Sequence, residues 1–207
     1  MAIIRSIVYL AILSVTSLCF ADQSLPAQCT RACSTPFSQV LGQSPSGVVA
    51  YSNCNNQCVF KKPAFTEQTF TGIQWQCVEY ARRWLLINQG VVYGDVDIAA
   101  DIWSHDQVHT ADQTEQYDFQ TIVNGDHAHH VQKGDLLIYS KEFHGTGHVA
   151  VVLAVKPQQQ VVQVGEQNYK NTPWHNGYAR EIPYVMHQNQ QWLLDPYLLG
   201  WKRVAKE

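Results

Sequence analysis

Three aliphatic segments in the C-terminal half constrain the fold most. Residues 135–139, 148–155 and 160–166 are rich in aliphatic, often β-branched side chains, and Gly134 and Pro157 stand at their boundaries. Short segments of this kind, with turn residues between them, predict strands of a mostly antiparallel sheet. The second segment is apolar on both faces, so we expect it at the centre of the sheet with a helix covering one face.

Other segments complete an α+β fold. Residues 178–183 have strand character, and residues 192–204 are too apolar for a free tail, so we expect them to pack back on the domain. Residues 91–103 predict a turn that leads into a short helix. Residues 104–132 are polar and look irregular.

Residues 74–88 are the clearest helix candidate and carry an isolated cysteine in the first turn. Apolar side chains recur at helical spacing from Val78 to Leu85, and Gly90 lies where a helix often ends. The free N–H groups and the dipole at a helix N-terminus stabilise a thiolate and can hold an oxyanion. Cys77 is therefore a candidate nucleophile; the alternative is a structural thiol in the core.

Composition limits the partners of the chain. Its 207 residues are 45% apolar and 15% charged, and the formal net charge is -3. This is enough for one domain with a modest extension. Because no run of Lys or Arg occurs, we expect neither nucleic acid nor an anionic membrane as the main partner.

The N-terminus predicts export. Arg5 precedes the apolar run 6–20, and the positions that a signal peptidase recognises, up to Ala21, carry small residues. Residues 1–21 are therefore predicted to be a signal peptide. No other segment is apolar over a membrane-spanning length, and the mature chain is expected to be a periplasmic or secreted protein without a membrane span.

Export changes how the cysteines are interpreted. Cys29 and Cys33, like Cys54 and Cys58, are four positions apart, so neighbouring helical turns would pair Cys29 with Cys58 and Cys33 with Cys54. The sequence leaves the two other pairings open, and a zinc site is the less favoured alternative. In both cases Cys77 stays apart as a free thiol.

The clustered cysteines lie in an extension rather than a domain. Residues 22–66 are rich in Ser, Gln, Pro and Gly and contain too few large apolar residues for a core. We therefore expect a disulfide-stapled extension at 22–66 and a catalytic domain at 67–207.

A base and an orienting group can be sought near the predicted sheet. His148 opens the central strand after a glycine-containing loop, and a turn centred at Pro157 would place Glu166 opposite His148. Asn168 follows on the same side of the strand as a second orienting or substrate-binding group. His144 is the competing base, but no predicted strand holds it.

Several other polar residues have open roles. A second oxyanion donor could come from Gln74, Gln76 or Thr71. Glu79 can pair with Arg82 or Arg83, and Arg82 alternatively binds a substrate carboxylate. Five histidines lack a recognisable third ligand, so we interpret them as surface residues and predict no metal and no cofactor. They are His105, His109, His127, His129 and His130.

Four motifs together resemble a known family. They are QCVEYARRW at 76–84, GDLL at 134–137, GHVAVV at 147–152 and EQN at 166–168. In combination they resemble the cysteine, histidine-dependent amidohydrolase/peptidase (CHAP) domains, and among these the amidase domains of the glutathionylspermidine synthetase/amidase family. The likeness extends from about residue 67 to residue 203.

The resemblance implies a papain-like fold, in which an N-terminal helix with the nucleophilic cysteine packs on an antiparallel sheet. It implies Cys77 as nucleophile, His148 as general base and then acid, and Glu166 as the orienting group. Arg82 and Asn168 are implied less directly as neighbours of the site, and Gln76 joins them as a candidate substrate-binding residue.

The expected activity is amide hydrolysis through an acyl-enzyme. For an exported member of such a family we expect peptidoglycan peptide amides as substrate, with a glutathione–polyamine amide as the alternative. A third possibility is a non-catalytic binding module with a dormant site.

Overall fold

A computed structural model describes residues 24–206, so the predicted signal peptide at residues 1–21 lies outside the described part of the chain. The largest sheet of that part has nine strands in the order β12-β11-β10-β9-β8-β13-β7-β6-β5, and neighbouring strands run antiparallel. The strands are β5 (Val91–Tyr93), β6 (Gln107–Thr110), β7 (Gln116–Val123), β8 (Leu136–Tyr139), β9 (His148–Lys156), β10 (Val161–Gly165), β11 (Arg180–His187), β12 (Gln190–Leu193) and β13 (Leu198–Ala205).

The central strands form where the aliphatic segments predicted them. β8, β9 and β10 are neighbours in the sheet, and β9 is buried on both faces along most of its length. Val149 and Val151 of β9 belong to a cluster on the helix side, whereas Ala150 and Val152 belong to a cluster on the other side. The predicted antiparallel sheet is confirmed.

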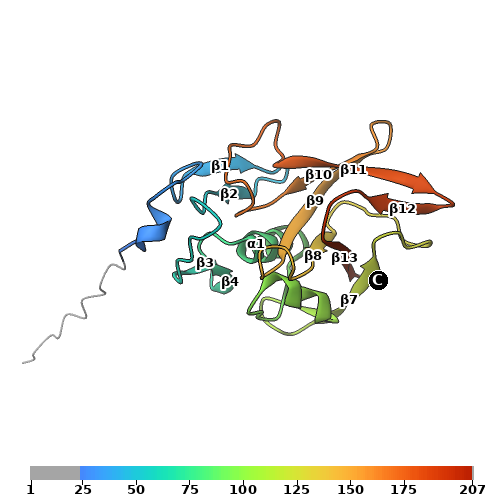
Figure 1. Ribbon diagram of the computed structural model, residues 1–207. Coiled ribbons are helices and arrows are strands. Elements are labelled where there is room, and N and C mark those ends of the chain that lie inside the picture. The colour runs from blue at the N-terminus through green and yellow to red at the C-terminus, as the bar shows by residue number, and fades with distance from the viewer. Residues whose placement is uncertain (1–23, 207) are drawn as a thin grey trace, which may run out of the picture.

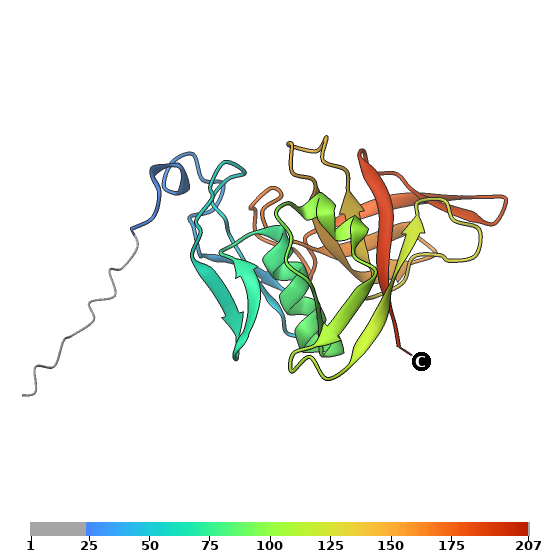
Figure 2. The same cartoon turned by 90° about the horizontal axis from the view of Figure 1, so that it is seen from below.

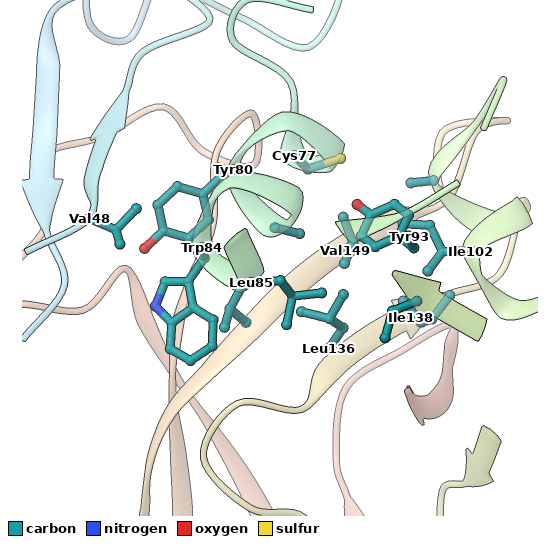
Figure 3. Close-up of a cluster of buried hydrophobic side chains, with 14 of the residues drawn as sticks. Val48, Cys77, Tyr80, Trp84, Leu85, Tyr93, Ile102, Leu136, Ile138 and Val149 are labelled. Atoms are coloured by element: carbon teal, nitrogen blue, oxygen red, sulfur yellow. The ribbon is translucent and has the colours of Figure 1, made fainter. Parts of the chain in front are cut away.

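One α-helix covers the first of these clusters. Helix α1 (Cys77–Gln89) begins at the isolated cysteine and ends at Gly90, whose backbone lies in the left-handed region with φ 67°. Tyr80, Trp84 and Leu85 are buried in one apolar cluster with Leu136 of β8 and Val149 of β9 (Figure 3). The other helical segments within residues 24–206 are the short 3₁₀ turns η1 (Ala27–Cys29) and η2 (Ala99–Ser104).

The polar region 104–132 is more regular than the sequence indicated. It contains β6 and β7, which extend the sheet toward β5. In β7 only Phe119 and Ile122 are buried, three positions apart, so the alternation that marks a strand is missing. The C-terminal strand β13 lies between β8 and β7, which explains the apolar character of the chain end.

The N-terminal region forms two small hairpins beside α1. They are β1 (Val40–Gln43) with β2 (Val49–Tyr51), and β3 (Pro63–Thr66) with β4 (Thr69–Ile73). In Figure 1 and Figure 2 these hairpins lie on one side of α1 and the large sheet lies on the other. Residue 66, where we expected the extension to end, is the last residue of β3.

Two disulfides cross-link the start of this region. Cys29 bonds Cys58 and Cys33 bonds Cys54, which is the pairing that the spacing favoured. The apolar cluster around them is small: Cys29, Cys58 and Phe60, with Phe37 partly buried against it. Within residues 24–206, Cys77 is the one free cysteine.

Candidate active site

Cys77 is the first residue of α1 and its thiol is 8% exposed. Tyr80 is the first residue whose N–H bonds back into the helix, to the Gln76 carbonyl at 3.2 Å. The N–H groups before it point out of the helix start, where they favour negative charge. The helix thus places the thiol where a thiolate and an oxyanion are both stabilised.

His148 and Glu166 lie next to each other beside this thiol. The Nε2 atom of His148 is 2.8 Å from Glu166 Oε2, and the two side chains are 2% and 3% exposed. His148 is the first residue of β9, and Glu166 directly follows the end of β10. Because Nε2 is engaged by the carboxylate, Nδ1 is the ring nitrogen left to face Cys77.

The hairpin register that led to this pair differs from the predicted one. The turn occupies residues 157–160, with Lys156 opposite Val161, and an irregularity after Gln163 shifts the pairing so that Gly165 lies opposite Val151. The prediction that Glu166 lies directly opposite His148 was wrong. The two side chains meet where the ladder ends, because β10 ends at Gly165, directly before Glu166, and β9 begins at His148.

The surroundings favour an ion pair between thiol and imidazole. Burial opposes ionisation of Cys77, but the charge and hydrogen bond of His148 and the backbone N–H groups of Val149 and Val78 lower the thiol pKa below its ordinary value. Burial also disfavours the His148 cation, yet the Cys77 thiolate and Glu166 raise its pKa to about 9. Both pKa shifts favour a thiolate paired with an imidazolium.

A basic residue that the sequence reasoning missed completes the site. Arg180 Nε donates to Glu166 Oε1 at 2.7 Å, and Arg180 Nη2 donates at 3.4 Å to Oε2, the oxygen that also contacts His148. Burial raises the pKa of Glu166, but the hydrogen bond from His148 and the charge of Arg180 outweigh it and keep the pKa below its ordinary value. The sequence contained an indication of this role, because Arg180 lies in the strand predicted at residues 178–183. That strand pairs with β10, which ends directly before Glu166.

A cleft of about 430 Å³ opens at Cys77 and His148. Its walls combine apolar side chains with a few polar groups from α1, the loop before η2 and the loop before β9. The lining includes Phe70, Ile73, Val78, Val96, Ile98 and Phe143.

All three predicted substrate-binding residues line this cleft, but each is already hydrogen-bonded. Arg82 bonds Asp95 at 3.0 Å and the Gly94 carbonyl at 2.6 Å. Asn168 Nδ2 donates to Gln76 Oε1 at 2.7 Å. Their role in binding stays a prediction.

The candidates for a second oxyanion donor either form hydrogen bonds with other groups or lie outside the cleft. The Thr71 hydroxyl is buried and bonds Ala64 O and Glu79 Oε1. Gln74 lines a different groove, and the Gln76 amide donates to the Cys58 carbonyl at 3.1 Å. The donors left at the site are the backbone N–H groups of the helix start.

Glu79 and the five histidines lie outside the catalytic contacts. Glu79 is fully buried and pairs with Arg83 at 2.7 Å rather than with Arg82. Of the five histidines, three are exposed and two are partly buried. Within residues 24–206 no group of three or more His, Cys, Asp or Glu side chains could hold a metal ion. The same residues contain no helix that is long and apolar enough to cross a membrane.

A reactive thiol at a helix start, an imidazole and a carboxylate define the class of the cysteine-dependent hydrolases. Comparison with known proteins narrows that class. Residues 68–168 match the CHAP domain family, and this part of the chain is a CHAP domain. The family match and the relatives below support a cysteine-dependent amidohydrolase activity.

Two named relatives match this chain over only part of their own length. The bifunctional glutathionylspermidine synthetase/amidase of Escherichia coli K12 is 32% identical over 189 residues, which cover 83% of this chain and 30% of the relative. Trypanothione synthetase of Crithidia fasciculata is 29% identical over 188 residues, which cover 86% of this chain and 28% of the relative. The chain thus spans under a third of the length of these relatives.

Proposed function

We propose that the protein is an exported cysteine amidase or peptidase in which Cys77, His148 and Glu166 hydrolyse an amide bond. The observation that carries the proposal is the buried contact of 2.8 Å between His148 and Glu166 beside the one free cysteine of the described residues. The lowered thiol pKa of Cys77 is what such a nucleophile requires.

The reaction follows from the protonation states of the pair. The Cys77 thiolate attacks the carbonyl carbon, and N–H groups at the start of α1 stabilise the oxyanion. His148 then gives its proton to the leaving amine, so the C–N bond breaks and a thioester remains on Cys77. Neutral His148 next takes a proton from water, whose attack on the thioester releases the acid and restores the thiolate.

Glu166 acts on the imidazole rather than on the substrate. It fixes the ring by accepting from Nε2 and stabilises the imidazolium by its charge. This division of work is the one expected of a papain-like arrangement, which we include in the proposal.

Two disulfides in the extension support an exported enzyme, because such bonds persist in oxidising compartments. In that setting we propose peptide amides of peptidoglycan as the substrate. The relatives favour a second candidate, the amide of a glutathione–polyamine conjugate, because the name of the Escherichia coli protein specifies a glutathionylspermidine amidase.

The test is zymography on cell-wall substrate beside a glutathionylspermidine hydrolysis assay, with the wild type and Cys77→Ala. We expect the wild type to clear the cell wall and Cys77→Ala to lose at least about a thousandfold of the activity. Iodoacetamide should label Cys77 at neutral pH.

Each outcome decides one part of the proposal. Activity retained by Cys77→Ala would remove the nucleophile assignment. Cleavage of the small conjugate without clearing of the cell wall would favour the second substrate. An unlabelled Cys77 together with no hydrolysis would favour a dormant binding module.

A further inference from the structure

Arg180 begins β11 and contacts the carboxylate of Glu166, the proposed orienting group. Its Nε donates to Glu166 Oε1 at 2.7 Å while Glu166 Oε2 accepts from His148 Nε2 at 2.8 Å. Arg180 Nη2 also donates to Oε2 at 3.4 Å, so the arginine contacts both oxygens of the buried carboxylate and shares one of them with the histidine. Rotation of the Glu166 carboxylate would break both contacts, so the arginine fixes the direction from which the imidazole is held.

The guanidinium is itself held by other elements. Nη1 donates to Asp195 Oδ2 at 2.6 Å, and Nη2 donates to the Tyr139 hydroxyl at 2.9 Å. That hydroxyl in turn donates to Asp195 Oδ2 at 2.6 Å. The Tyr169 ring stacks under the guanidinium, with 4.3 Å between the guanidinium carbon and the ring centroid. The arginine is therefore fixed from β8, from the loop before β13 and from the loop after β10.

This arrangement determines the charge of Glu166 as well as its direction. A carboxylate that is 3% exposed gains a proton unless cations or N–H groups compensate for the lost water. His148 supplies one such group and Arg180 supplies the other. Once protonated, Glu166 could no longer stabilise an imidazolium, and the thiolate of Cys77 would lose its partner.

We propose that Arg180, clamped by Asp195 and Tyr139, is a positioning residue that orients Glu166 and keeps it ionised for His148. The inference rests on the proposed function, in which Cys77 and His148 react as a thiolate–imidazolium pair. It assigns a role in that reaction to a residue that contacts neither the thiol nor the cleft.

The test compares Arg180→Met with a matched control, Arg203→Met. Arg203 also forms a largely buried ion pair, with Asp135 at 2.7 Å. Its side chain is 15% exposed, close to the 18% of Arg180. Asp135 precedes β8, at the end of that strand opposite Tyr139. Both variants lose a buried ion pair of an arginine, but only Arg180→Met also loses a contact with Glu166.

The first readout is the rate of Cys77 alkylation by iodoacetamide as a function of pH. Without Arg180, Glu166 binds a proton at higher pH. The acid limb of this profile, where the alkylation rate falls as the pH decreases, should therefore move to higher pH by about one unit. In Arg203→Met the limb should stay where it is in the wild type. Steady-state hydrolysis gives the second readout: kcat of Arg180→Met should fall about tenfold or more at pH 6 and less at pH 8, with KM changed less than about threefold.

Two further variants guard against a folding defect. Asp195→Asn keeps the arginine but weakens its clamp, so the acid limb should move in the same direction by a smaller amount. Arg180→Gly should regain activity when guanidinium is added at concentrations that leave the wild type unchanged, because the ion can occupy the vacated position.

The outcomes separate this inference from the proposed function. A folded Arg180→Met protein with the wild-type acid limb overturns the role of Arg180, and so does an equal shift in Arg203→Met. A wild-type Cys77 that resists alkylation at neutral pH overturns the proposed ion pair instead.

Discussion

The two sides of the cleft are held in different ways. On the helix side, Gln76 precedes Cys77 and donates to the Cys58 carbonyl at 3.1 Å, and Asn53 donates to the same carbonyl at 2.8 Å. Both contacts belong to a segment that disulfides cross-link and that has a small apolar cluster. On the sheet side, His148 begins a strand that is buried on both faces.

This contrast indicates which perturbation each side should resist. Apolar burial on the two faces of β9 contributes stability that oxidation and reduction do not change. The extension buries too little apolar surface to rely on the same effect, so its stability depends on covalent cross-links and polar contacts. We expect the sheet side to determine whether chemistry occurs and the extension to determine how firmly the helix start is held.

Replacement of His148 on the sheet side should have the largest effect. His148→Ala removes the proton donor for the leaving amine and the partner of the thiolate, so kcat/KM should fall by about a thousandfold or more. The matched comparison is His144→Ala, because His144 also lines the cleft but is exposed in the loop before β9. We expect a loss of less than about threefold there. A greater loss in His144→Ala than in His148→Ala would show that the base had been misassigned.

Removal of a disulfide tests the helix side and should have the next largest effect. The double substitution Cys33→Ser with Cys54→Ser opens a cross-link between residues 21 positions apart. It should lower the free energy of unfolding by about 2–4 kcal/mol, measured by urea denaturation. Lys61→Ser, an exposed change in the same extension, should stay within about 0.5 kcal/mol of the wild type. An unchanged unfolding free energy in the double variant would mean that the extension does not depend on this bond.

The pH dependence tests how the two sides act together and is the smallest of the three effects. Although burial disfavours the cation, Cys77 and Glu166 raise the pKa of His148 to about 9, so the imidazolium persists at neutral pH and is lost as the pH rises through about 9. Activity should therefore decrease about tenfold per unit above that pH. Because the folded pKa of His148 is above the unfolded value, the stabilisation by its charge is complete below the unfolded pKa and vanishes over the same rise. A kcat/KM profile that stays flat to pH 10 would contradict the ion pair.

The sequence by itself determined the local parts of this protein. Cys77 at a helix start, the helix end at Gly90 and the aliphatic strands depend on residue periodicity and turn residues, which act over a few positions. The spacing of the clustered cysteines favoured the pairing that the structure has, and the CHAP motifs pointed to the family.

Tertiary structure alone decided the contacts between distant segments. The turn at residues 157–160 gave β9 and β10 a register other than the predicted one, yet Glu166 still reaches His148. Arg180 meets Glu166, Asp195 and Tyr139 only because four parts of the chain converge at one end of the sheet. Such contacts depend on the order of the strands in the sheet and on the residue at which each strand ends. The side-chain pattern along a single strand carries no information about either.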